Sequence, residues 1–103
     1  MDQKRRVVVT GLGLISPLGN SVKTSWHSAI EGRSGAALIS KFDTENFLTK
    51  FGATVKDFEA LDCIDPKEAR RTDLFIQYGT AAAIEAINDS GFLEFYQLED
   101  IGV

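Results

Sequence analysis

Residues 5–20 read RRVVVTGLGLISPLGN, and the architecture that we expect for the chain starts from them. The three branched valines at positions 7–9 suit a strand that is covered on both faces, as in a parallel sheet. The run ends at Gly11 and Gly13, where a side chain would obstruct a tight turn or a closely approaching backbone. The segment therefore predicts a buried strand that turns sharply on glycines and leads into a helix.

The same glycines invite a comparison with dinucleotide-binding loops. Gly11 and Gly13 supply two glycines of the pattern G-x-G-x-x-G, but the third position is Ser16. Pro17 then removes a backbone donor and delays the helix to about Asn20, whereas a pyrophosphate needs a helix N-terminus directly at the turn. No acidic residue closes a second strand about twenty residues further on, as a ribose contact requires. The pattern thus favours a structural turn over a nucleotide site.

Size and composition narrow the classes of protein. A chain of 103 residues is a single domain at most, and 44% hydrophobic and 25% charged residues are ordinary for a globular protein. A net charge of −4 disfavours a nucleic-acid-binding protein with a uniformly basic surface. The sequence offers no apolar stretch that would cross a membrane and no signal peptide. Cys63 is the single cysteine, which fits a reducing, cytoplasmic setting.

Periodicity and capping signals predict the regular elements. We expect a helix over 21–31, a short strand over 35–39 and a half-buried edge strand over 51–56. The side chains that these elements should bury are Val22, Trp26, Ile30, Phe51, Ala53 and Val55. The strongest prediction is a helix over 73–90, which Gly91 ends.

The helix over 73–90 is apolar around most of its circumference, so it must be surrounded by protein. At ~1.5 Å per residue it spans roughly 27 Å, which the rest of the chain is too short to enclose. The small residues at 79–83 would let another backbone approach closely. We therefore expect a second subunit or further chain to cover it, and residues 101–103 resemble the opening of a strand.

A compact helix-start signal occupies 65–68, with a capping acid, a proline at the first position and a glutamate at the third. Lys67, Arg70 and Arg71 follow at spacings of three and four, which places the three cations on one face. Two interpretations stay open from charge alone. The cations form a solvated face that pairs with Glu68 and Asp73, or they dock an acidic partner.

Two other residues have side chains that could take part in catalysis, and for both we favour a structural role. His27 lies off the apolar stripe of its helix, and we expect a solvent-facing residue without an acidic partner. Cys63 has Asp62 and Asp65 as its charged neighbours, which disfavour a thiolate. We interpret Cys63 as a small apolar filler, so neither residue is proposed as catalytic.

Several sequence blocks resemble β-ketoacyl-[acyl carrier protein] synthases, in particular the synthase II type. They are RRVVVTGLG at 5–13, SPLGN at 16–20, FDT at 42–44, KF at 50–51, VKDF at 55–58, KEARRTD at 67–73, FIQYG at 75–79 and DSG at 89–91. The likeness runs over essentially the whole chain. Related polyketide ketosynthases share the opening block, so the family is better specified than the subtype.

The resemblance implies a thiolase-like α/β fold, of which residues 1–103 would be the N-terminal part of the first half. It also implies a cytoplasmic homodimer that elongates fatty acids by decarboxylative Claisen condensation without a metal or redox cofactor. The family's nucleophilic cysteine and two histidines belong to segments after Val103, so no catalytic residue is carried over. Residues that match Lys67, Arg70 and Arg71 contribute to docking the acidic acyl carrier protein, and this favours docking over the solvated face.

Two functions follow from these observations. The first is an enzyme fragment, the leading quarter or so of an elongating ketosynthase, which is inactive by itself. The second is a non-catalytic module that binds acyl carrier protein or a synthase subunit.

Overall fold

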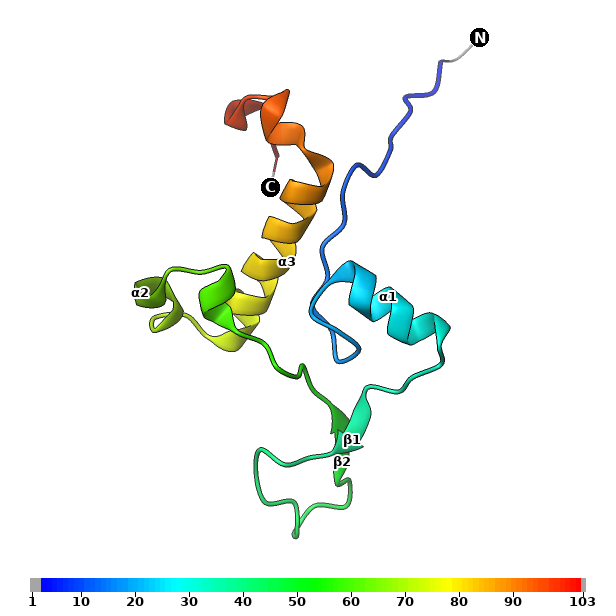
Figure 1. Ribbon diagram of the computed structural model, residues 1–103, viewed down its shortest axis with the longest axis vertical. Helices are drawn as coiled ribbons and strands as arrows, with labels where there is room; N and C mark the ends of the chain where they lie inside the picture. Colours follow the sequence, from blue (N-terminus) through cyan, green and yellow to red (C-terminus); the bar gives the residue numbers. More distant parts are fainter. Residues whose placement is uncertain (1–2, 103) are drawn as a thin grey trace.

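The structure is a computed structural model that describes residues 3–102. Its elements, in chain order, are α1 (Val22–Ile30), β1 (Ala36–Leu38), β2 (Phe51–Ala53), the 3-10 turn η1 (Ala60–Asp62), α2 (Pro66–Ala69), α3 (Leu74–Ser90) and the 3-10 turns η2 (Phe92–Glu94) and η3 (Leu98–Asp100). An extended N-terminal segment passes between α1 and α3, and the β1–β2 hairpin projects from the end opposite the two termini (Figure 1). The arrangement is open, with principal extents of 61 × 40 × 22 Å.

The strand expected at 7–9 is absent, and this prediction was wrong. The three valines lie in irregular backbone, and Val7 exposes 92% of its surface. Branched side chains favour extended backbone, but a strand also needs a hydrogen-bonded neighbour, and no segment of 3–102 pairs with 7–9. The parallel sheet expected from this run is likewise missing, since the one sheet among the described residues is the antiparallel β1–β2 pair.

The glycines lie directly against the backbone of α3. A Cβ atom built on Gly13 would sit 1.7 Å from the carbonyl oxygen of Ala82, and one built on Gly11 would sit 2.3 Å from that of Ala86. Only glycine permits so close an approach. The expectation that these positions meet another backbone is confirmed, and that backbone belongs to α3.

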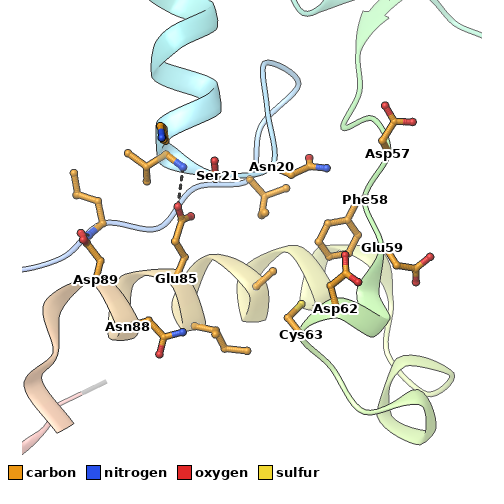
Figure 2. Close-up of a pocket in the computed structure, with 16 residues that line it drawn as sticks. Asn20, Ser21, Asp57, Phe58, Glu59, Asp62, Cys63, Glu85, Asn88 and Asp89 are labelled. Carbon is orange, nitrogen blue, oxygen red and sulfur yellow. Dashed lines mark hydrogen bonds between the residues drawn. The ribbon is translucent and has the colours of Figure 1, made fainter. Parts of the chain in front are cut away.

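Two carboxylates of α3 hold the same segment. Glu85 accepts the backbone N–H of Leu14 on Oε2 at 3.0 Å. Its Oε1 accepts the N–H of Val22 at 2.9 Å, the bond drawn at Glu85 in Figure 2. Asp89 Oδ2 accepts the N–H of Leu12 at 3.1 Å. The side chains of α3 thus satisfy backbone donors that have no strand partner, and Glu85 also satisfies a free donor in the first turn of α1.

Helix α1 forms where expected, but the face that it buries is different. Ser21 caps it, since its hydroxyl accepts the N–H of Thr24 at 3.1 Å. Trp26 of the predicted apolar stripe is 67% exposed, whereas Ser25 is only 3% exposed. Ser25 Oγ lies 2.8 Å from Ser16 Oγ and donates to the carbonyl of Gly19 at 3.1 Å. The helix therefore packs on the 16–19 turn through hydroxyls. Of its apolar stripe Val22 is half-buried, whereas Trp26 and Ile30 stay exposed.

The hairpin confirms the positions of two expected strands but not the predicted burial. Strands β1 and β2 pair in antiparallel register, with Ala36 opposite Ala53 and Leu38 opposite Phe51. Phe51 and Ala53 are exposed rather than half-buried. A two-stranded ribbon has no covered face until another layer packs on it, and none of the described residues supplies that layer.

Helix α3 agrees with its prediction closely. Asp73 occupies the N-cap position, and Gly91 ends the helix in the left-handed region at φ 65°. Its apolar side chains are not enclosed, because Leu74 and Phe75 are exposed and no hydrophobic side chain among the described residues is fully buried. Residues 101–102 form no strand, and Val103 lies outside the described residues. Within 3–102, no helix has both the length and the apolar character to span a membrane.

Candidate functional site

The three predicted docking cations lie on α2 and the turn that follows it. Asp65 caps the helix through Oδ1, which accepts the N–H of Lys67 at 2.8 Å, and Pro66 is the first helical residue. The helix is shorter than its charge spacing suggested, because it ends at Ala69. Arg70 is its C-cap, and Arg71 lies in the next turn. We call residues 66–72 the basic turn.

The cations of the basic turn have no ion-pair partner among residues 3–102. Lys67, Arg70 and Arg71 are all exposed. The ion pairs found within 3–102 involve only His27, Glu31 and Arg33, so the expected pairing with Glu68 and Asp73 does not occur. Their positive charge is therefore available to a partner rather than neutralised inside the chain.

A buried amide that the sequence interpretation missed fixes the basic turn to α3. Gln77 is 8% exposed, and its Nε2 donates to the carbonyls of Ala69 at 2.9 Å and Thr72 at 3.2 Å. The hydroxyl of Thr72 donates to the carbonyl of Glu68 at 3.0 Å, which closes the same turn. The available signal was a lone amide near the start of a helix that is otherwise apolar there.

An aromatic pair steadies the segment that precedes α2. Phe58 and Tyr78 meet edge to face, with ring centroids 4.9 Å apart and an interplanar angle of 84°. Tyr78 follows Gln77 on α3. The same turn of α3 therefore contacts the segment before α2 through Phe58 and the segment after α2 through Gln77.

An open cavity of about 700 Å³ lies between the start of α1, the segment over 57–63 and α3 (Figure 2). Acidic side chains contribute much of its polar wall, among them Asp62 and Glu85. Cys63 also lines it, is half-buried and directs its thiol to the carbonyl of Ala60 at 3.6 Å. The lining contains no histidine that would act as a base for this thiol. We therefore keep the interpretation of Cys63 as a small side chain, which here lines the cavity.

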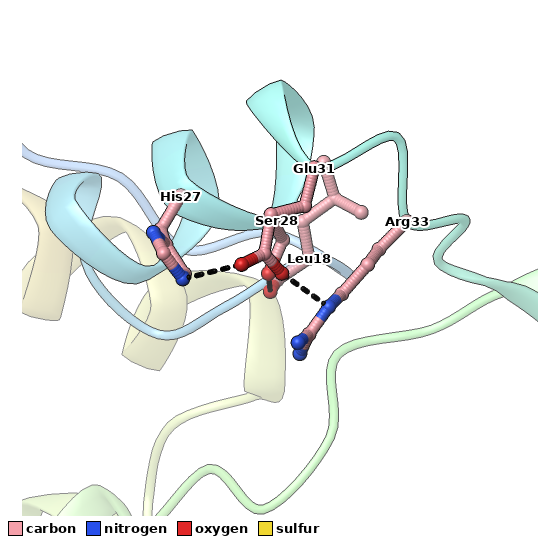
Figure 3. Close-up of polar contacts among 5 residues, drawn as sticks. All are labelled: Leu18, His27, Ser28, Glu31 and Arg33. Carbon is pink, nitrogen blue, oxygen red and sulfur yellow. Dashed lines mark hydrogen bonds and ion pairs between the residues drawn. The ribbon is translucent and has the colours of Figure 1, made fainter.

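His27 is exposed as predicted, but the expectation that it lacks an acidic partner was wrong. Its Nε2 lies 2.9 Å from Glu31 Oε1, one helical turn further on, and the other oxygen of Glu31 lies 2.7 Å from Arg33 Nε (Figure 3). Ser28 beside it donates to the carbonyl of Leu18 at 3.1 Å. These contacts fasten the end of α1, and His27 and Cys63 do not line a common cavity. Among the described residues, no cluster of three or more ligand-type side chains suits a metal ion.

Comparison with known proteins identifies the family. Residues 4–103 match the model of the β-ketoacyl synthase N-terminal domain. The chain belongs to the β-ketoacyl synthase family. The resemblance read from the sequence blocks is therefore confirmed.

Three similar relatives carry the same name. The chain is 54% identical over 88 residues to 3-oxoacyl-[acyl-carrier-protein] synthase 2 of Vibrio harveyi, which covers 85% of this chain and 21% of the relative. It is 47% identical over 90 residues to the protein of the same name from Staphylococcus aureus strain COL, covering 87% and 22%. For the Synechocystis protein of that name the identity is 42% over 102 residues, covering 98% and 24%. The chain thus spans between a fifth and a quarter of these synthases.

A solved structure supports the same fold. The ishigamide ketosynthase/chain length factor aligns with 97% of this chain at a TM-score of 0.71 and 36% identity, and the match covers 24% of that chain. The synthase chain therefore holds part of a thiolase-like α/β fold, as predicted. The exposed apolar faces of α1, α3 and the hairpin belong to a partial fold.

Proposed function

We propose that the complete protein is a 3-oxoacyl-[acyl-carrier-protein] synthase of type 2, a homodimeric cytoplasmic enzyme of fatty acid elongation. The relatives' shared name and identities of 42–54% over most of the chain support this activity. Residues 1–103 would form the N-terminal part of its ketosynthase domain and be inactive alone. The reaction joins an enzyme-bound acyl group to malonyl-[acyl carrier protein] with loss of carbon dioxide.

The chemistry explains why this segment is not the catalytic one. Acyl transfer needs a thiolate that attacks the carrier's thioester, and a carrier thiolate then leaves. Decarboxylation releases carbon dioxide and gives an enolate, which attacks the carbonyl carbon of the enzyme thioester. Fixed donors stabilise the tetrahedral oxyanion, which then collapses and expels the enzyme thiolate. Cys63 faces an acidic wall without a histidine, and His27 is paired with Glu31 on the surface. We therefore assign the nucleophile and both histidines to the rest of the synthase, and the reaction needs no metal or redox cofactor.

The role that we assign to this segment is docking of acyl carrier protein on the basic turn. The observation that supports it is the group of three exposed cations without ion-pair partners within 3–102, on a turn that a buried amide fixes. An acidic protein would be attracted to such a surface and oriented by it. The alternative module, which binds a carrier or a synthase subunit without chemistry, would use the same turn.

The test reverses two charges in the complete synthase. For Arg70→Glu/Arg71→Glu we expect the dissociation constant for acyl carrier protein to rise at least about 10-fold at low ionic strength, with a smaller effect at about 0.5 M salt. The control is Arg6→Glu/Lys41→Glu, which changes the net charge equally at exposed sites outside the basic turn. An unchanged dissociation constant for the first variant at low salt would remove the docking assignment.

A further inference from the structure

We propose that Gln77 is a positioning residue for carrier-protein docking, because its buried amide holds the backbone on both sides of Arg70 and Arg71. This inference rests on the proposed function of the basic turn. It adds a residue that touches no partner and carries no charge.

The side-chain amide of Gln77 binds the backbone on either side of the two arginines. Gln77 Nε2 donates to the carbonyls of Ala69 and Thr72, the residues directly before and after the two arginines. Both acceptors are carbonyl oxygens, so both protons of the amide nitrogen are used. With its side chain 8% exposed, Gln77 makes these bonds largely shielded from water. One side chain thus fixes the start and the end of the four-residue segment 69–72.

The backbone of the basic turn needs this support. Helix α2 has four residues, too few for a helix that is stable by itself, and its last carbonyls lack partners within the helix. The carbonyl of Glu68 is bonded by the N–H of Arg71 at 3.0 Å and by the Thr72 hydroxyl at 3.0 Å. The carbonyls of Ala69 and Thr72 depend on Gln77. Without the amide, the turn keeps its cations but loses the bonds that hold it on α3.

A fixed turn matters to docking because ordering a loop on binding weakens affinity. The two guanidinium groups are exposed and unpaired among the described residues, so the backbone beneath them fixes only where the two side chains leave the surface. Releasing that backbone spreads the positive charge over many arrangements while the net charge stays the same. The cost should appear in carrier binding and not in the chemical step.

The test uses Gln77→Met in the complete synthase, since methionine keeps the length and apolar bulk of the side chain but has no N–H donor. We expect the dissociation constant for acyl carrier protein to rise about 5-fold at low salt, and KM for the carrier-linked substrate to rise with kcat unchanged. The matched control is Ser28→Ala, which removes a side-chain bond to the carbonyl of Leu18 far from the basic turn along the chain. It should leave carrier binding unchanged. If the methionine variant does not fold, Gln77→Asn takes its place. Asparagine keeps an amide with a shorter reach, and this variant should weaken carrier binding in the same direction but by less.

A double-mutant cycle with Arg70→Glu/Arg71→Glu separates the possible outcomes. If Gln77 acts through the arginines, Gln77→Met weakens binding in the wild type and adds under about twofold in the charge-reversed background. If charge reversal weakens binding but Gln77→Met and Gln77→Asn leave it unchanged, docking stands and the positioning role is overturned. If charge reversal itself has no effect, the docking function fails. An equal loss from Gln77→Met in both backgrounds also overturns the positioning role, because the effect then does not pass through Arg70 and Arg71.

Discussion

Substituting Gly13 by alanine tests the contact between the N-terminal segment and α3 most directly. The added Cβ would lie 1.7 Å from the Ala82 carbonyl oxygen, 2.6 Å from its carbon and 2.9 Å from the Ala86 nitrogen, all atoms of the α3 backbone. Since real Cβ contacts essentially never fall under 3.0 Å, the two segments must separate by about 1.3 Å. That displacement also breaks the bonds from Leu14 to Glu85 at 3.0 Å and from Leu12 to Asp89 at 3.1 Å.

The expected loss combines two terms. Overpacking against a rigid backbone costs about 1–3 kcal/mol, and each broken hydrogen bond adds about 0.5–1.5 kcal/mol. We therefore expect Gly13→Ala to lower the free energy of unfolding of the complete synthase by about 2–6 kcal/mol.

The measurement is a urea titration at fixed protein concentration, with Gly52→Ala as the matched control. A Cβ on Gly52 would meet only Ile39 side-chain carbons at 3.5 and 3.6 Å, which is ordinary contact. The control should change the free energy of unfolding by under about 0.5 kcal/mol. If Gly13→Ala behaves like the control, the close approach to α3 does not exist in the protein and the reasoning is refuted.

Two further predictions concern the same helix and the chain as a whole. Both oxygens of Glu85 accept backbone N–H groups, and an amide offers only one acceptor, so Glu85→Gln should cost about 1–2 kcal/mol in the urea titration of the synthase. Asp89 uses a single oxygen, which Asp89→Asn retains, so its loss should stay below about 0.5 kcal/mol, and equal losses would contradict the anchoring roles. Residues 1–103 expressed alone should show no cooperative heat-absorption peak in scanning calorimetry, because no hydrophobic side chain among the described residues is fully buried. A sharp peak would show that the segment has a core of its own.

The sequence predicted the helices well because their signals are local. A capping acid followed by proline marked the start of α2, and Gly91 marked the end of α3. The face of each helix was harder to predict, since burial depends on what packs there. Ser25, and not Trp26, faces inward on α1 because the turn over 16–19 offers hydroxyl and carbonyl partners rather than an apolar surface.

The wrong prediction of a strand at 7–9 and the failure to foresee the anchoring side chains of α3 have a shared reason. A strand is defined by a neighbour that can lie anywhere in the chain, and no described residue supplies one to the three valines. Gln77 and Glu85 bind backbone groups of other segments, and backbone groups leave no trace in the side-chain pattern. The cations of the basic turn were found from their spacing, but the residue that holds them was not.

Helix α3 emerges as the element that organises this part of the synthase. Its interior carries three polar side chains that each bind the backbone of another segment, and these are Gln77, Glu85 and Asp89. On the same face as Glu85 and Asp89, Ala82 and Ala86 admit the glycines of the N-terminal segment to direct backbone contact. The basic turn and the N-terminal segment are therefore both held against one helix, α3. A polar residue inside an apolar helix is costly unless it is bonded, and here each such bond replaces a missing strand or helix partner. The backbone contacts of this part of the fold are therefore formed among the described residues, although its apolar faces stay exposed.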